Sequence, residues 1–246
     1  MRKYIVIIAI LVVYILVVLS GNLFLGNKTY LLISPKVRLT YNKGKWSSIL
    51  PNKKTIGKLN FYDMNEHKTI GAYNVIYDGN IKVKYNKNYE TIEDDTIYAS
   101  SNNIKFIQYK KETVLTNSEQ NYFLKGAKLN LEGIISLKKV VIDLDNDKEL
   151  ETIYFVNNYE FLDDELSNYY SGVYLYDNKT YEKIIAKSST KGFTNFYNIF
   201  SIIDFKNDGK YEIIISDAGI DRSHASDEYY MYGLEDNKYI ELISIK

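Results

Sequence analysis

Residues 140–156 read VVIDLDNDKELETIYFV, and residues 201–215 repeat the same design as SIIDFKNDGKYEIII. In both stretches an apolar, β-branched run leads into a short acidic loop, and a second apolar run follows the loop. The loops begin at Asp143 and Asp204, 61 residues apart, and each is followed by a segment that looks like a hairpin. Repetition of this unit predicts a repeated β architecture such as a propeller.

The hairpin-like segments are the second repeated feature. Residues 173–184 and 230–243 each read as strand, polar turn and strand, residues 37–49 give a plausible third copy, and residues 97–107 give a fainter fourth. Asn-rich hairpins also resemble one another without being repeats, which leaves this second reading open for the first and fourth copies. About 220 residues at this period hold three to four units, fewer than a seven-bladed propeller needs.

The rest of the body also has the pattern of strands. Short alternating segments rich in Ile, Val, Tyr and Thr, such as residues 37–41, 81–85 and 104–107, are bounded by Asn, Gly or Lys. The one stretch with helical character, around residues 163–170, is short. We therefore predict an all-β protein of propeller-like repeats of antiparallel strands, forming a small or degenerate propeller.

The N-terminus has the pattern of a membrane-spanning helix. Arg2 and Lys3 precede an apolar stretch from Tyr4 to Leu25, whose 22 residues would span roughly 33 Å as a helix. The positive-inside tendency then leaves the body outside the cytoplasm, as a single-pass protein of the cell membrane. A cleaved signal peptide, with Val18 and Ser20 before the cleavage point, is the alternative and would give a secreted protein.

These patterns divide the chain into three parts. Residues 1–26 form an N-terminal transmembrane anchor or uncleaved signal, residues 27–135 an N-terminal β region, and residues 136–246 the repeat region with the two acidic loops. No Pro- or Gly-rich linker marks a boundary between the last two.

Composition excludes several classes of function. Lys and Arg number 31, Asp and Glu also number 31, and the chain has no Cys. A neutral chain has no electrostatic reason to follow a phosphate backbone, so we expect no nucleic-acid partner. Without Cys there are no disulfides, no thiolate nucleophile and no Cys-based metal site.

The acidic loops are the candidate metal sites. Ca²⁺ takes six to eight oxygens, and alternate residues of a tight loop can point carboxylates at one centre. Side-chain ligands are predicted at positions 1, 3, 5 and 9 and a backbone carbonyl at position 7; in the first loop these are Asp143, Asp145, Asp147, Glu151 and the carbonyl of Glu149. In the second loop the remaining acids are Asp204, Asp208 and Glu212, which we expect to bind Ca²⁺ weakly or not at all.

The pattern differs from that of an EF-hand. An EF-hand needs a bidentate Glu at position 12 and helices on both sides, whereas position 12 is Tyr154 in the first loop and Ile215 in the second, between strands. The alternative for both loops is that their acids only form turns and cap backbone N–H groups.

The spacing Asp-x-Asp-x-Asp-x-x-x-Glu between strands resembles the calcium loops of FG-GAP and VCBS-type repeats, as found in integrin-like β-propellers. The resemblance covers roughly residues 139–246 and implies bound calcium. The first loop departs from the family at position 6, where Lys148 stands in place of Gly. The second departs at position 3, where Lys206 stands in place of Asp or Asn and its ammonium could replace the ion.

The sequence favours a non-enzymatic, calcium-binding module for binding or scaffolding at the cell surface, with an unknown protein or envelope polymer as partner. Two alternatives stay open: a hydrolase of envelope polysaccharide, and a membrane-tethered sensor or inhibitor of an envelope enzyme. Residues 217–227 bring Asp, Ser and His224 close in sequence. We predict no catalytic residue there, because a hydrolase triad converges from distant parts of a fold.

Overall fold

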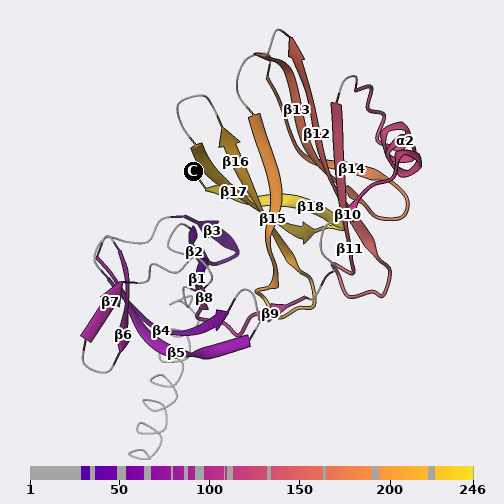
Figure 1. Ribbon diagram of the computed structural model, residues 1–246. Helices are drawn as coiled ribbons and strands as arrows, with labels where there is room; N and C mark the ends of the chain where they lie inside the picture. Colours follow the sequence, from indigo (N-terminus) through magenta and orange to yellow (C-terminus); the bar gives the residue numbers. More distant parts are fainter. Residues whose placement is uncertain are drawn as a thin grey trace, which may run out of the picture. The chain divides into compact units, whose positions relative to one another are not determined.

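The computed structural model describes residues 29–245 except 34–36, 49–53, 64–67, 79, 86–87, 92–96, 108, 110–112, 132–133, 163–164, 190–193 and 221–224. Within this part the chain is built of antiparallel strands and has one α-helix, which confirms the all-β prediction (Figure 1). None of the helical structure found among these residues is long and apolar enough to cross a membrane. The predicted anchor, residues 1–26, lies outside the described residues.

The chain folds as two compact units. The first comprises residues 1–62 and 70–101, and the second comprises residues 63–69 and 102–246. Residues 102–135, predicted above as part of the N-terminal β region, thus pack with the second unit.

The first unit contains one eight-stranded sheet in the order β3-β2-β1-β8-β4-β5-β6-β7. Its strands are β1 (Thr29–Ile33), β2 (Val37–Asn42), β3 (Lys45–Ser47), β4 (Lys54–Asp63), β5 (Lys68–Tyr77), β6 (Ile81–Tyr85), β7 (Asn88–Thr91) and β8 (Ile97–Ser100). Its core includes Leu59, Phe61, Val75 and Val83, which alternate with more exposed neighbours along their strands. The predicted hairpin at residues 37–49 is present as β2 and β3.

The second unit contains two five-stranded sheets, with orders β10-β11-β12-β13-β14 and β18-β17-β16-β15-β9. The first sheet consists of β10 (Thr113–Val114), β11 (Ile134–Ile142), β12 (Glu151–Leu162), β13 (Glu165–Tyr176) and β14 (Tyr181–Ser189). The second consists of β9 (Lys105–Phe106), β15 (Thr194–Asp204), β16 (Glu212–Ile220), β17 (Ala225–Glu235) and β18 (Lys238–Ile245).

The two sheets of the second unit share one plan. In each, a short edge strand pairs with a long strand, an acidic loop leads to the next long strand, and an outer hairpin completes the sheet. Each outer hairpin also has a register shift, at Val173/Tyr174 in one sheet and at Met231/Tyr232 in the other. The repeating unit expected from the sequence is therefore a complete sheet. No closed propeller is seen among the described residues.

One local prediction is wrong. The faint fourth hairpin, residues 97–107, is not a hairpin, because β8 pairs with β1 in one unit and β9 pairs with β15 in the other. The short stretch with helical character, residues 163–170, enters strand β13 at Glu165. The helix of the described residues is instead α2 (Asn117–Gly126).

The two five-stranded sheets share one hydrophobic core. Along β12, Ile153 and Phe155 belong to the core cluster that also holds Ile213 and Ile215 of β16. The intervening residue Tyr154 packs in a second cluster, to which Phe123 of α2 contributes. Helix α2 lies beside this sheet (Figure 1). Both faces of β12 are thus covered between Ile153 and Val156, which explains why this stretch has no polar face.

Candidate metal centre

The first acidic loop, residues 143–151, joins β11 to β12 and is held by its own carboxylates. The two oxygens of Asp143 accept hydrogen bonds from the N–H groups of Asp147 and Lys148, at 3.2 and 3.1 Å. Glu151 Oε2 accepts from the N–H of Leu144 at 2.7 Å, which ties the end of the loop to its start. The turn is completed by positive φ angles of 61° at Asn146 and 76° at Lys148.

Three of the five predicted ligands meet at one point. One carboxylate oxygen from each of Asp143, Asp145 and Glu151 lies within 4.8 Å of the other two. Asp145 Oδ1 is buried and has no hydrogen-bond partner in the structure. A buried, unpaired carboxylate oxygen beside two other acids is costly without a cation, so this donor set fits a hard cation such as Ca²⁺.

Burial and neighbouring negative charge raise the pKa values of two acids in this cluster. Burial raises the pKa of Asp145, and the neighbouring charges of Asp147 and Asp143 raise it further. Burial also raises the pKa of Glu151, and the charge of Asp145 adds to that effect. A bound cation would favour the charged forms and reverse both shifts.

The other two predicted ligands lie at the edge of the cluster. Asp147 Oδ1 accepts a hydrogen bond from the N–H of Glu149 at 2.7 Å. Both residues line a cavity of about 330 Å³ together with Asp145 and Glu151. The cavity is acidic, since Asp177 and Glu182 also line it; its remaining walls come from Leu175, Lys179, Thr180, Leu234, Asn237 and Tyr239.

The second acidic loop, residues 204–212, repeats these hydrogen bonds position by position. The oxygens of Asp204 accept from the N–H groups of Asp208 and Gly209, both at 3.1 Å. Glu212 Oε2 accepts from the N–H of Phe205 at 3.0 Å, and Asp208 Oδ1 accepts from the N–H of the residue two positions on at 3.0 Å. The φ angles of 57° at Asn207 and 81° at Gly209 match those of the first loop.

In the second loop Lys206 stands at position 3, where the first loop has an acid, and a further lysine comes from β9. Lys206 Nζ lies 3.6 Å from Glu212 Oε1, and Lys105 Nζ of β9 lies 3.9 Å from Asp204 Oδ2. Asp204 and Glu212 are almost fully buried, with 0% and 2% of their surface exposed. Burial raises the pKa of Glu212 to about 7, against the lowering effect of the Lys206 charge.

Each loop has a further partner that sequence reasoning missed. The carbonyl of Leu144 in the first loop accepts hydrogen bonds from the Tyr239 hydroxyl at 3.2 Å and from the N–H of Tyr211 at 2.9 Å. The equivalent carbonyl in the second loop, that of Phe205, accepts from Asn102 Nδ2 at 3.2 Å. The loop pattern does not predict these contacts, because all three donors come from outside their loops.

A second polar cluster joins the two sheets away from the loops. Asp217 of β16 is 1% exposed; it accepts hydrogen bonds from Asn195 at 2.8 and 2.9 Å and pairs with Lys187 of β14 at 2.7 Å. Lys187 also lies 3.4 Å from Glu228. These contacts commit Asp217 to holding the sheets together. His224, from the same sequence segment, lies outside the described residues.

The chain matches none of the family models, curated proteins or solved structures with which it was compared.

Proposed function

We propose that this chain is a membrane-anchored, extracytoplasmic calcium-binding β-repeat protein that acts as a non-enzymatic binding or scaffolding module at the cell surface. The calcium site is the first acidic loop, with Asp143, Asp145 and Glu151 as the innermost ligands. Asp147 and the carbonyl of Glu149 complete the coordination. The membrane part of the proposal rests on the sequence of residues 1–26.

The observation that carries the proposal is the meeting of Asp143, Asp145 and Glu151 within 4.8 Å, together with a buried oxygen of Asp145 that has no partner. Three carboxylates in a partly desolvated loop repel one another, and a divalent cation turns that repulsion into attraction. The ion would fix the turn between β11 and β12 and one wall of the acidic cavity. Its role is then structural, with the partner binding to a surface that the ion keeps rigid.

Thermal unfolding tests the proposal. The full chain, purified in a neutral detergent because its first residues are apolar, is melted in EDTA and in millimolar Ca²⁺. A ligand that binds only the folded state at 100 times its Kd stabilises by about 2.7 kcal/mol, which raises the midpoint measurably. Asp145→Asn should remove the rise, and Glu90→Gln, an exposed change on β7, should keep it. Equal midpoints with and without Ca²⁺ in the unsubstituted chain would reject the calcium site.

One observation favours a second candidate, a hydrolase of envelope polysaccharide. Asp145 and Glu151 both line the cavity, both have raised pKa values and carry oxygens within 4.8 Å of each other, as close as the paired carboxyl groups that act together in retaining glycosidases. A dye-labelled cell-wall polysaccharide incubated with the chain in EDTA separates the two functions. Release of dye that Glu151→Gln abolishes would favour the hydrolase, and no release would favour the calcium module.

A further inference from the structure

We infer that Lys206 takes the place of the metal ion in the second acidic loop, so that the protein carries a metal-dependent and a lysine-filled version of the same loop. The inference rests on the proposed function only where it names calcium as the ion of the first loop. What it says about the second loop depends on contacts within that loop.

The two loops have the same backbone. Four hydrogen bonds from loop N–H groups to loop carboxylates recur at equivalent positions, with lengths of 2.7–3.2 Å in the first loop and 3.0–3.1 Å in the second. The φ angles at positions 4 and 6 differ by 4° and 5° between the loops. The chain therefore provides its own comparison, in which only the side chains differ.

The decisive difference is at position 3. The first loop has Asp145 there and the second has Lys206. The four ligand side chains of the first loop carry a formal charge of −4, whereas the equivalent four of the second carry −2, before Lys105 is counted. The second loop therefore has little electrostatic need for a divalent ion.

The position of the ammonium supports this replacement. Glu212 Oε2 is used by the N–H of Phe205, and its other oxygen, Oε1, faces Lys206 Nζ at 3.6 Å. In the first loop the corresponding carboxylate, that of Glu151, meets Asp145 instead. The positive charge thus comes from position 3 itself, the position that in the first loop adds a carboxylate.

Two acids of the second loop are more deeply buried than their counterparts in the first, as this replacement requires. Asp204 is 0% exposed and Glu212 is 2% exposed, whereas Glu151 is 9% exposed and Asp143 is only half-buried. A tethered cation is always present, so its loop can bury acids that would otherwise be unpaired whenever the metal dissociates. The second loop is then formed at any calcium concentration, and only the first responds to calcium.

A reciprocal exchange at position 3 tests the inference, with bound Ca²⁺ counted by equilibrium dialysis of the full chain in detergent. Lys206→Asp should raise the ratio of bound calcium to protein from one to two. Lys210→Asp is the matched control, because it changes the same charge in the same loop at position 7, where a ligand would be the backbone carbonyl. That control should leave the ratio at one.

The opposite exchange keeps the test decisive if Lys206→Asp does not fold. Asp145→Lys should bring bound calcium to zero, and in EDTA it should melt above the unsubstituted chain, because the ammonium supplies the missing cation. A lower melting point in EDTA for Asp145→Lys would overturn the inference.

The outcomes for the two proposals are distinct. One bound ion in both the unsubstituted chain and folded Lys206→Asp would overturn the inference and leave the proposed function standing. No ion in the unsubstituted chain and one in Lys206→Asp would reject the calcium role of the first loop and support the inference. No ion in either would reject both.

Discussion

Lys148 holds a backbone conformation that favours glycine. Its φ angle is 76°, at the position where the second loop has Gly209 with φ 81°. A residue with a Cβ atom in this region costs on the order of 1 kcal/mol relative to Gly. Lys148→Gly should therefore increase the free energy of unfolding by about 1 kcal/mol, measured by urea denaturation in EDTA.

Gly209→Ala gives the mirror control for this prediction. A Cβ atom added at Gly209 would meet nothing closer than 3.7 Å, so its cost should be conformational and of the same size with the opposite sign. If both substitutions leave the stability unchanged, the positive φ angle at position 6 carries no strain.

Glu212 should make stability depend on pH. Its pKa is raised from 4.5 to about 7 in the folded chain, mainly by burial. The folded state therefore binds the proton more tightly than the unfolded state, and this stabilisation is fully present below pH 4.5 and lost as pH rises through 7. The expected loss is on the order of 3 kcal/mol, measured by urea denaturation at a series of pH values in EDTA.

Glu212→Gln is the control for the pH dependence. Its amide oxygen can still accept the hydrogen bond from the N–H of Phe205, but it has no proton to titrate. The decrease in stability between pH 4.5 and 7 should become smaller in this variant. An unchanged decrease would assign the pH dependence to other groups.

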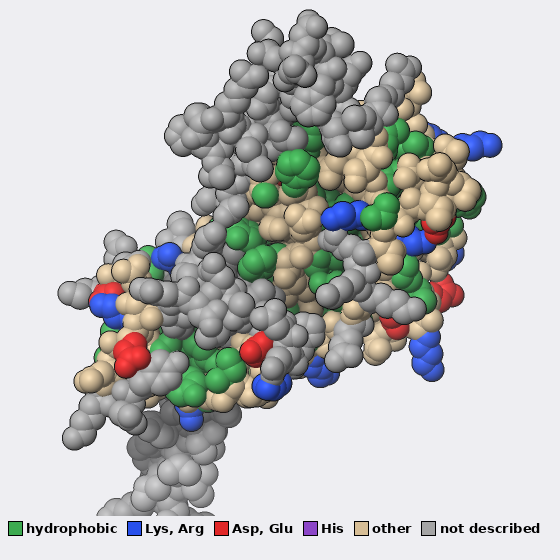
Figure 2. Space-filling view, viewed as in Figure 1, with side chains coloured by type: hydrophobic (Ala, Val, Ile, Leu, Met, Phe, Trp, Pro, Cys, Tyr) green, Lys and Arg blue, Asp and Glu red, His purple; other side chains and the backbone are tan. Residues whose placement is uncertain are grey.

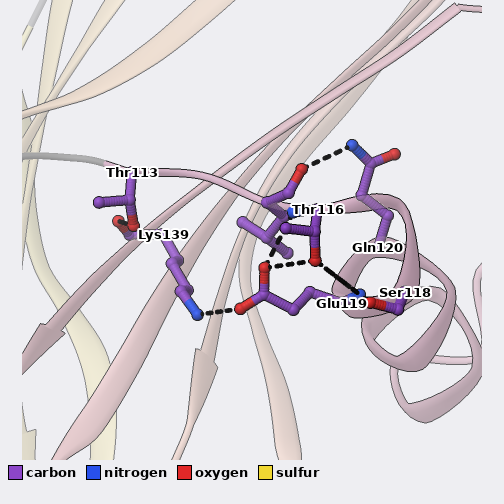
Figure 3. A network of polar contacts seen from close by, with 7 residues as sticks. Thr113, Thr116, Ser118, Glu119, Gln120 and Lys139 are labelled. Atoms are coloured by element: carbon purple, nitrogen blue, oxygen red, sulfur yellow. Dashed lines mark hydrogen bonds and ion pairs between the residues drawn. The ribbon is translucent and has the colours of Figure 1, made fainter.

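Helix α2 begins with a capping box that fixes it to the outer face of its sheet. The Thr116 hydroxyl accepts from the N–H of Glu119 at 3.4 Å, and a Glu119 carboxylate oxygen accepts from the N–H of Thr116 at 2.8 Å (Figure 3). The other carboxylate oxygen pairs with Lys139 of β11 at 2.6 Å. Further along the helix, Phe123 is fully buried and stacks on Tyr154.

Loss of the cap should weaken this element. Thr116→Ala removes the acceptor for the N–H of Glu119 and should cost about 1 kcal/mol, measured by urea denaturation. Glu119→Gln is the matched comparison, because Gln keeps a capping box but loses the ion pair with Lys139. We expect it to cost less than Thr116→Ala, since an ion pair near the surface contributes little. A larger cost for Glu119→Gln would assign the stability to the ion pair.

The element scale also shows what the sequence could predict. The strands β2 and β6 and the outer hairpins follow from alternation and turn residues, which are local signals. Helix α2 was missed although Thr116 and Glu119 form a capping-box signature, because only ten helical residues follow and strand-forming aromatic residues lie among them. The pairing of β9 with β15 could not be predicted, since it joins segments about 100 residues apart.

The residues of the candidate site also fall into those that a local sequence pattern could predict and those that it could not. The spacing of acids predicted Asp143, Asp145 and Glu151 as ligands, and the structure brings these three together. Lys148, at the position where the resembled pattern has Gly, has a positive φ angle. The partners from other elements, Lys105 among them, depend on tertiary packing, so no local pattern could indicate them.

At the scale of the whole molecule, the equivalent loop carbonyls of the two repeats accept hydrogen bonds from different parts of the chain. The carbonyl at position 2 of the first loop is capped by Tyr239 from the hairpin of the second repeat. The equivalent carbonyl of the second loop is capped by Asn102, from the segment that precedes β9. Helix α2 packs on the face of the first sheet that points away from the shared core. Each of the two repeats thus has packing partners from outside its own sheet.

Charged side chains of both signs are present on the described surface. On the face seen in Figure 2, Lys and Arg side chains and Asp and Glu side chains are scattered among hydrophobic and other side chains, and the whole sequence has 31 of each sign. The acidic cavity beside the first loop is the local exception. Calcium should therefore act on one unit rather than on the charge balance of the whole chain.

The two compact units should respond differently to calcium, and the chain contains a natural probe for the difference. Both acidic loops lie in the second unit, whereas Trp46, the single tryptophan, lies on β3 in the first and packs against Tyr41 at 5.0 Å. If each unit unfolds as its own cooperative domain, calcium stabilises only the unit that binds it.

Trp46 fluorescence, excited where tyrosine does not absorb, should then report the same melting temperature in EDTA and in millimolar Ca²⁺. Far-UV circular dichroism, which follows strands of both units, should show a component that moves to higher temperature with Ca²⁺ and stays in place in Asp145→Asn. Equal shifts by both probes would mean that the units unfold together, and the division at residues 101/102 would not be a boundary of stability.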